Sequence, residues 1–94
     1  MEFEWDPEKA RINESKHAVS FFEACEVFDD DYSSSVRDPD HSFDEKWFII
    51  FGKSHDGKYL VVSYTERNDR IRIISARQMT PRERRAYEQW KRHP

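Results

Sequence analysis

A predicted strand that continues directly into a capped helix occupies residues 70–90, and it constrains the fold more than any other stretch. The first part, RIRIISA, is rich in isoleucine and is typical of a buried strand. Thr80, Pro81 and Glu83 then begin a helix: threonine is the N-cap, proline lies in the first turn and glutamate completes a capping box. The same stretch holds six of the 16 Lys and Arg residues, so we expect it to do more than pack.

Charge is distributed unevenly along the chain. Residues 1–50 hold 14 of the 19 acidic residues, whereas residues 51–94 hold 11 of the 16 basic ones. This asymmetry indicates a positive surface for a polyanion, beside an acidic surface that suits a basic partner. The alternative is that the two halves neutralise each other within the fold.

The length of 94 residues predicts a single domain over residues 1–94. With 15% aromatic residues, we expect a small core built on large side chains such as Phe48, Phe51, Tyr64 and Trp90. No stretch is apolar enough to cross a membrane, and the acidic N-terminus is unlike a signal peptide. The single cysteine, Cys25, is expected to be a small buried residue and fits a reducing, cytoplasmic location.

The remaining patterns predict an α+β fold: a small antiparallel β-meander packed with an N-terminal helix pair and a C-terminal helix. Asp6 and Pro7 start the first helix, which ends near His17, and Ser20 with Glu23 forms the capping box of the second. A polar loop follows over residues 29–44, with at most a short strand at 32–36. The predicted strands are a short one around residues 3–5 and the meander strands 46–53, 59–66 and 71–76.

The chemistry-bearing residues exclude several classes of site. The four histidines are scattered, no metal-ligand spacing occurs, and two glycines are too few for a phosphate-binding loop, so neither a metal nor a cofactor is expected. What remains is a set of cations. Arg67, Arg72 and Arg77 lie on or beside the last two strands, and Lys16 and His17 end the first helix. In a regular strand, the odd separation of Arg72 and Arg77 would place them on opposite faces.

RNA cleavage without a metal ion uses Arg, Lys and His side chains of this kind. The 2′-hydroxyl must lose a proton, the leaving 5′-oxygen must gain one, and the phosphorane needs positive charge beside it. Histidine titrates near neutral pH and can transfer these protons, while arginine matches phosphate oxygens with its planar fork. Lys16 or Tyr64 is an alternative proton donor. Simple binding of phosphate or of a protein partner explains the same composition.

Three blocks of sequence resemble the BrnT family of toxins from bacterial type II toxin–antitoxin systems. They are FEWDPEKARINESKHAVSF (3–21), FIIFGKSHDGKYLVVSYTER (48–67) and RIRIISARQMTPRERRAYEQW (70–90). The resemblance carries over to the motif residues Asn13, Lys16, His17, Arg67, Arg72, Ser75, Arg77, Glu83, Arg84 and Tyr87. The chain departs from the family pattern at Ala18, where glycine is usual and the helix end would differ, and at Lys46, where arginine is usual.

The resemblance implies a RelE-like fold with helices on one side of the sheet. It also implies a ribonuclease that blocks translation, is neutralised by a BrnA-like antitoxin in a hetero-oligomer, and meets operator DNA only through that antitoxin. On this basis we expect a metal-independent endoribonuclease with catalytic residues Lys16, His17, Arg67, Arg72 and Arg77, and with RNA contacts at Lys53, Arg70 and Arg84. The alternative is a non-catalytic module that binds the antitoxin and regulates the operon.

Several of these residues also have a purely structural interpretation. Glu83 is expected to serve mainly as a capping residue, and Asn13 to hydrogen-bond a loop backbone. Arg84 is suited to an i, i+4 ion pair with Glu88 on an exposed helix face. Tyr87 and Trp90 are expected to lie chiefly in the core.

Overall fold

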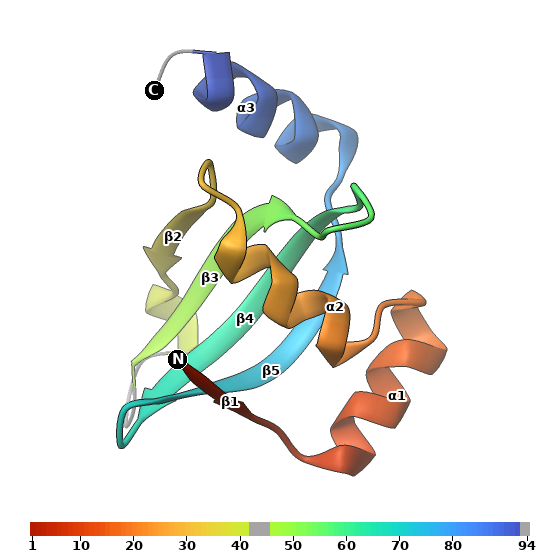
Figure 1. The fold of residues 1–94 in the computed structure, drawn as a ribbon, viewed down its shortest axis with the longest axis vertical. Helices are drawn as coiled ribbons and strands as arrows, with labels where there is room; N and C mark the ends of the chain where they lie inside the picture. The colour runs from red at the N-terminus through yellow and green to blue at the C-terminus, as the bar shows by residue number, and fades with distance from the viewer. Residues whose placement is uncertain (42–45, 93–94) are drawn as a thin grey trace.

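The structure, a computed structural model, describes residues 1–41 and 46–92. Figure 1 shows a sheet with helices arranged around it. In chain order the elements are β1 (Glu2–Glu4), α1 (Pro7–His17), α2 (Phe21–Glu26), the 3₁₀ turn η1 (Val27–Asp29), β2 (Ser34–Arg37), the 3₁₀ turn η2 (Pro39–His41), β3 (Trp47–Lys53), β4 (Tyr59–Arg67), β5 (Arg70–Gln78) and α3 (Pro81–Arg92). The predicted α+β class is confirmed.

The sheet has the strand order β1-β5-β4-β3-β2. The predicted meander is its centre: β3, β4 and β5 pair antiparallel in sequence. Gly57 has a φ of 84° in the turn between β3 and β4, and Asn68 and Asp69 have φ values of 49° and 66° in the two-residue turn between β4 and β5. Positive φ values of this kind match the right-handed twist of a hairpin. β1 adds a parallel edge beside β5, and β2 forms the other edge.

The helix α2 covers one face of the sheet (Figure 1). Ser20 caps it and forms the predicted capping box with Glu23. The core between α2 and the sheet includes Phe21, Val27 and Leu60. A Cβ atom on Gly52 would meet Cγ1 of Val27 at 2.7 Å, so glycine at this position allows η1 to approach the strand closely.

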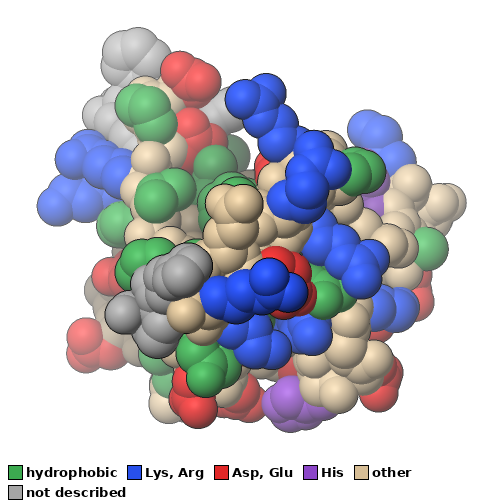
Figure 2. Space-filling view, turned by 90° about the horizontal axis from the view of Figure 1, so that it is seen from above, with side chains coloured by type: hydrophobic (Ala, Val, Ile, Leu, Met, Phe, Trp, Pro, Cys, Tyr) green, Lys and Arg blue, Asp and Glu red, His purple; other side chains and the backbone are tan. Residues whose placement is uncertain are grey.

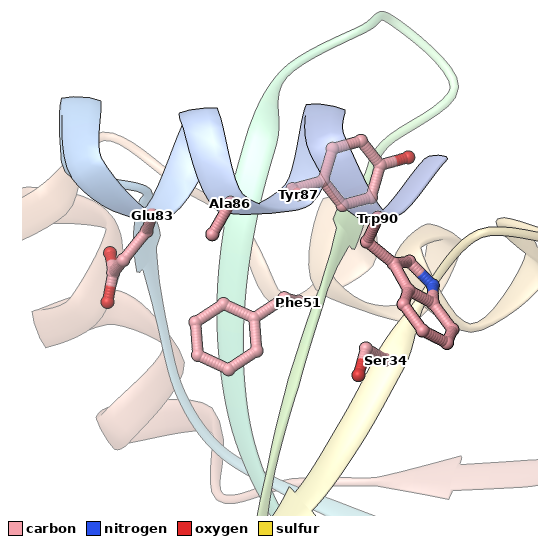
Figure 3. Close-up of a pocket in the computed structure, with 6 residues that line it drawn as sticks. All are labelled: Ser34, Phe51, Glu83, Ala86, Tyr87 and Trp90. Atoms are coloured by element: carbon pink, nitrogen blue, oxygen red, sulfur yellow. The ribbon is translucent and has the colours of Figure 1, made fainter. Parts of the chain in front are cut away.

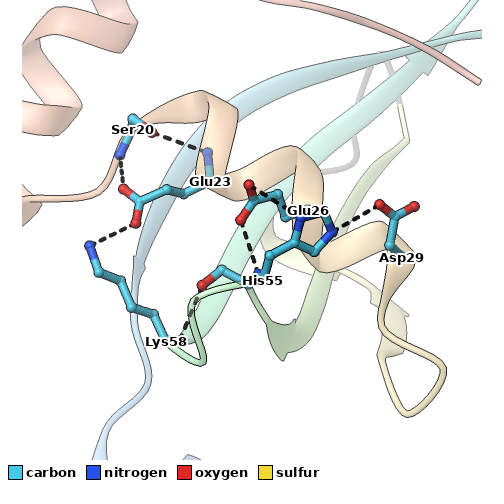
Figure 4. A network of polar contacts seen from close by, with 7 residues as sticks. Ser20, Glu23, Glu26, Asp29, His55 and Lys58 are labelled. Atoms are coloured by element: carbon cyan, nitrogen blue, oxygen red, sulfur yellow. Dashed lines mark hydrogen bonds and ion pairs between the residues drawn. The ribbon is translucent and has the colours of Figure 1, made fainter.

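Polar contacts tie α2 to the turn between β3 and β4 (Figure 4). Nζ of Lys58 lies 2.7 Å from a carboxylate oxygen of Glu23. In the same turn, Nε2 of His55 lies 3.2 Å from Oδ2 of Asp29, and the backbone N–H of His55 donates to Glu26 at 3.0 Å. His55 is exposed, and its contacts with Asp29 and Glu26 give it a structural role in this turn.

The helix α1 lies beside β5 (Figure 1). Asn13 attaches the helix to this strand. The buried Asn13 amide donates to the carbonyls of Val19 and Ala76 at 3.0 and 2.9 Å, and its Oδ1 accepts from the Ala76 N–H at 3.1 Å. The predicted contact with a loop backbone is confirmed, and the strand contact adds to it. Ile12, on the same helix, is 48% exposed.

The polar segment predicted as a loop is more ordered than expected. It contains Asp30, whose Oδ2 accepts from the Lys53 N–H at 2.8 Å and from the Tyr87 hydroxyl, and then β2, which begins at Ser34. Burial alone would raise the pKa of Asp30, but hydrogen bonds from Tyr87 and two backbone N–H groups lower it overall. Residues 42–45 of this predicted loop lie outside the described residues.

The prediction that Trp90 lies in the core is wrong, because 52% of it is exposed. Tyr87 is buried as expected. Figure 1 shows α3 at one end of the sheet, and there Trp90 lines a cavity with Ser34 and Phe51 instead of filling the core. In residues 1–41 and 46–92, no helix has the length and apolar composition needed to cross a membrane.

Candidate active site

A β-bulge in β5 places Arg72 and Arg77 on the same face of the sheet. In the ladder, Arg72 pairs with Thr65 and Arg77 with Val61. The two β4 partners are separated by an even number of residues, so they and the two arginines share a face. The register shift inserts Ile74 as the extra residue of the bulge. The prediction of opposite faces is therefore wrong, because it assumed a regular strand.

Ser75 lies on this face as well, since it pairs with Ser63 of β4. Alternation along β4 assigns the opposite face to Leu60, Val62 and Tyr64, which pack in the core around α2. The arginine-bearing face is thus the one that α2 leaves uncovered.

Arg77 is fixed by a bidentate ion pair with Glu83, in the first turn of α3. The two hydrogen bonds measure 2.8 Å from Nη1 to Oε1 and 3.0 Å from Nη2 to Oε2. Glu83 also completes the predicted capping box, accepting from the Thr80 N–H at 2.8 Å while its own N–H donates to the Thr80 hydroxyl. The Arg77 guanidinium, followed by these backbone contacts, lowers the pKa of Glu83 to about 2, and Glu83 raises the pKa of Arg77.

The contacts of Arg77 leave one side of its fork for a ligand. Within the described part of the chain, Nη1 donates to Glu83 and to the carbonyl of Gln78, and Nη2 donates once to Glu83. The remaining donors are Nε–H and the second hydrogen of Nη2, which point the same way. That pair matches two oxygens of a phosphate.

Lys16 and His17 end α1 beside this strand. They line a cleft of about 210 Å³ together with Lys9, Ile12, Asn13, Ile74 and Ser75. Both basic residues lie in the last turn of the helix, where the helix dipole favours positive charge. Ala18 follows in the left-handed conformation, with φ 57° and ψ 32°, so the departure from glycine leaves the usual form of helix end unchanged.

Of the predicted catalytic set, the structure places Lys16 and His17 in one cleft, and Arg77 on the strand that forms one wall of it. Ser75 belongs to the cleft of Lys16 and His17, and Arg77 is two residues further along the same face. Positions i and i+2 of a strand are about 7 Å apart, so the backbones of Ser75 and Arg77 are close, while the Arg77 guanidinium lies at Glu83 of α3.

Arg67 lies far from this group. It pairs with Arg70 at one end of the β4–β5 ladder, while Arg77 pairs with Val61 near the other end. At about 3.3 Å per residue, the six steps from residue 61 to residue 67 correspond to about 20 Å. One phosphate bound by Arg77 is therefore out of reach of Arg67.

Arg72 and Arg70 contact the acidic residues of β1. Nη1 of Arg72 lies 2.9 Å from Oε2 of Glu4. Arg70 lies 3.5 Å from a carboxylate oxygen of Glu2 and 4.0 Å from one of Glu4. The parallel pairing of β1 with β5 creates these contacts, and here the acidic first half of the chain does neutralise part of the basic second half.

Lys53 and Arg84 gather around Tyr59, a residue that the sequence did not single out. Nζ of Lys53 lies 4.7 Å and the Arg84 guanidinium carbon 4.0 Å from the centre of the Tyr59 ring. The Tyr59 hydroxyl donates to Glu88. Arg84 and Glu88 thus both contact Tyr59. The sequence had suggested an ion pair between Arg84 and Glu88. A tyrosine directly opposite a lysine across the β3–β4 hairpin was the available signal.

The end of the molecule that carries α3 is rich in positive charge. Figure 2 looks onto that end and shows many Lys and Arg side chains side by side. The basic residues of α3 are Arg82, Arg84, Arg85, Lys91 and Arg92, all exposed except the half-buried Lys91. Such a surface attracts a polyanion.

Carboxylates and histidines do not form a metal site in the described ranges 1–41 and 46–92, where no cluster of three or more His, Cys, Asp or Glu residues could hold an ion. In the acidic run at residues 29–31, Asp30 serves the contacts with Lys53 and Tyr87. Cys25 is half-buried on α2, and burial together with the nearby Glu26 and Asp29 raises the pKa of its thiol to about 11.

Comparison with known proteins first identifies the class: residues 5–83 match the description "Ribonuclease toxin, BrnT, of type II toxin-antitoxin system". The chain belongs to the BrnT family, which confirms the resemblance seen in the sequence. The family is described as one of ribonuclease toxins from type II systems, which implies RNA as the target and an antitoxin as the partner. No curated protein sequence matches the chain.

The fold is similar to that of a solved structure, the Brucella abortus ribonuclease toxin BrnT, in a crystal structure at 1.1 Å resolution. The TM-score is 0.63, the identity is 18%, and the match covers 85% of this chain and 97% of that one. At this identity the likeness concerns the fold alone, and it confirms the predicted architecture.

Proposed function

We propose that the toxin cleaves RNA without a metal ion at the face formed by Arg77, Ser75 and the end of α1. The observation that carries this proposal is the cleft shared by Lys16, His17 and Ser75, next to an arginine with one side of its fork available. Arg77 binds the scissile phosphate, and His17 and Lys16 transfer protons. Arg72 lies further along the same face and binds a neighbouring phosphate.

The reaction needs three things from this site. A proton leaves the 2′-hydroxyl, whose oxygen then bonds to phosphorus. The bond from phosphorus to the 5′-oxygen breaks, and that oxygen takes a proton, so that a 2′,3′-cyclic phosphate and a 5′-hydroxyl result. Histidine suits the proton transfers, while guanidinium and ammonium groups stabilise the charge on the phosphorane. These cations take the part that a metal ion plays in other nucleases.

Membership of the family supports a proposal for the biological setting as well. The toxin acts in the cytoplasm as a single domain over residues 1–94, and its RNA cleavage inhibits translation. A BrnA-like antitoxin binds it in a hetero-oligomer and carries the contact with operator DNA. The exposed cations of α3 support an acidic antitoxin segment as the neutralising element, because it would satisfy charges that otherwise attract RNA.

Cleavage of a single-stranded RNA in the presence of EDTA tests the proposal. Wild-type protein should cut the RNA, and Arg77→Ala should lower the rate about 10²–10³-fold, as removal of a transition-state donor does elsewhere. His17→Gln should lower it by about 10²–10⁴-fold. Arg85→Ala removes an equal charge from α3 and should retain most activity. Full activity in both Arg77→Ala and His17→Gln would refute these roles.

A non-catalytic role remains the second candidate, because carboxylates already engage both arginines: Glu83 holds Arg77 and Glu4 holds Arg72. In that case the toxin would act only through the antitoxin and the operon. Wild-type protein that leaves RNA intact with or without Mg²⁺, yet binds its antitoxin, would favour this candidate. Growth arrest on expression, relieved by Arg77→Ala, would exclude it.

A further inference from the structure

A cavity of about 270 Å³ lies beneath α3, and the phosphate chemistry proposed above does not use it. Figure 3 shows its lining, which comes from α3 on one side and from the sheet on the other: Ser34, Phe51, Glu83, Ala86, Tyr87 and Trp90. The Tyr87 hydroxyl is engaged by Asp30, so this residue presents its ring. The exposed Trp90 belongs to this cavity, which accounts for a large aromatic side chain left outside the core.

The lining suits a flat aromatic ligand. Phe51, Tyr87 and Trp90 supply three rings, and the Ser34 hydroxyl adds a group that can donate or accept a hydrogen bond. The volume is close to the lower end of ligand pockets, about 300 Å³, and fits a single ring system. Unpaired RNA bases bind proteins in this manner, stacked on aromatic side chains. A stable protein interface buries about 800 Å² on each partner, far more than these six residues offer.

Charge at the two ends of the cavity points to a nucleotide rather than an uncharged ring. At one end, Glu83 lines the cavity and holds Arg77 in its bidentate pair. At the other end, Lys91 follows Trp90 on α3 and places Nζ 5.4 Å from the centre of the Tyr32 ring. A strand of RNA along α3 would meet a cation on each side of the base.

We propose that this cavity is a base-binding subsite, in which Trp90 and Phe51 contact one unpaired RNA base while Arg77 binds the adjacent phosphate. The Ser34 hydroxyl hydrogen-bonds the edge of the base. The subsite rests on the proposed function, since it selects the nucleotide next to the phosphate that Arg77 holds. The toxin therefore has a preference for the base on one side of the cleavage point, and Trp90 is a determinant of that preference.

Sequencing of the products from a randomised single-stranded RNA tests this inference. Wild-type products should be enriched in one class of base beside the cut. Trp90→Ala should flatten that enrichment and lower kcat/KM about 10- to 100-fold, which corresponds to stacking of about 1–3 kcal/mol. Trp90→Phe keeps an aromatic ring and should retain most of the base enrichment and most of kcat/KM. Phe22→Ala is the matched control, because Phe22 is 73% exposed on α2, and it should change neither quantity.

Unchanged base preference and rate in Trp90→Ala would overturn the subsite, even with cleavage itself intact. Loss of antitoxin binding alone in that variant would also overturn it and would assign the cavity to the protein partner. If wild-type protein fails to cut RNA, the proposed function fails, and titration with the four nucleoside 5′-monophosphates decides the subsite separately. Fluorescence quenching that disappears in Trp90→Phe supports it, and no quenching in wild type refutes it.

Discussion

The carboxylate of Glu83 accepts hydrogen bonds of 2.8 and 3.0 Å from the two terminal nitrogens of the Arg77 guanidinium. This bidentate pair joins the end of β5 to the first turn of α3. The same carboxylate caps α3 and lines the cavity beneath it. One residue thus sets the orientation of the proposed phosphate ligand, the start of a helix and one wall of the proposed base subsite.

Glu83→Gln should therefore weaken catalysis without removing the cap. The glutamine oxygen still accepts a hydrogen bond from the Thr80 N–H, but the charged, bidentate ion pair with Arg77 is lost. We expect kcat for RNA cleavage to fall about tenfold, with a smaller change in KM, as for a residue that positions another. Glu14→Gln changes an exposed glutamate of α1 and is the control. An unchanged kcat in Glu83→Gln would show that Arg77 needs no help from Glu83.

The ion pair also predicts how stability depends on pH. In the folded protein the pKa of Glu83 is about 2, below the value of about 4.3 expected in the unfolded chain. Its contribution to the free energy of unfolding is thus fully present above about pH 4.3 and is lost as the pH falls towards 2. The urea midpoint of wild type should exceed that of Glu83→Gln at pH 6, and the gap should be much smaller at pH 2.5. An equal gap at both pH values would contradict this assignment.

The local signals in the sequence predicted the helix starts correctly. Asp6, Ser20 and Thr80 each accept a backbone hydrogen bond from the turn that follows them. A cap depends on residues within one turn, so its pattern is visible in a short window of sequence. The hairpin turn at Gly57 is local in the same way, because a few adjacent residues determine its conformation.

The site itself depends on long-range pairing, which a single sequence does not reveal. The bulge at Ile74 exists only in the register between β4 and β5, and it changes the face on which Arg72 lies relative to Arg77. The separation of Arg67 from Arg77 likewise follows from strand pairing. The exposure of Trp90 depends on where α3 crosses the sheet, although its spacing with Tyr87 is that of a buried helix face.

Asn13 should be the most sensitive polar residue for stability. Asn13→Ala removes the buried side-chain partner of three backbone groups: the Ala76 N–H, the Ala76 carbonyl and the Val19 carbonyl. Because an unsatisfied buried group costs about 1–3 kcal/mol, we expect a loss of about 3 kcal/mol in the free energy of unfolding. Urea denaturation measures it. Ser15→Ala, on the exposed side of α1, should cost less than about 0.5 kcal/mol. A comparable loss in both variants would argue against the bridging role.

Cys25 should react slowly with thiol reagents. Burial, with the negative charge of Glu26 and Asp29, raises the pKa of the thiol to about 11, so little thiolate exists at neutral pH. Labelling by iodoacetamide at pH 8 should be much slower than labelling of a cysteine peptide, and 6 M urea should remove the difference. Equal rates for the folded protein and the peptide would show that the thiolate is not suppressed. Because little thiolate exists at neutral pH, the Cys25 thiol has no part in the proposed RNA cleavage.

Ala18→Gly should stabilise the protein. Ala18 ends α1 with a φ of 57°, where an L-residue is strained by about 1–2 kcal/mol and glycine is not. Part of the gain is offset by the greater freedom of glycine in the unfolded chain, so we expect about 1 kcal/mol, or about 4–8 °C in Tm. Ser15→Gly is the matched control: it puts glycine inside the same helix and should destabilise by about 0.5–1 kcal/mol. RNA cleavage should be unchanged in Ala18→Gly, because α1 still places Lys16 and His17 beside Ser75. A lower Tm for Ala18→Gly would mean that the left-handed conformation carries no strain.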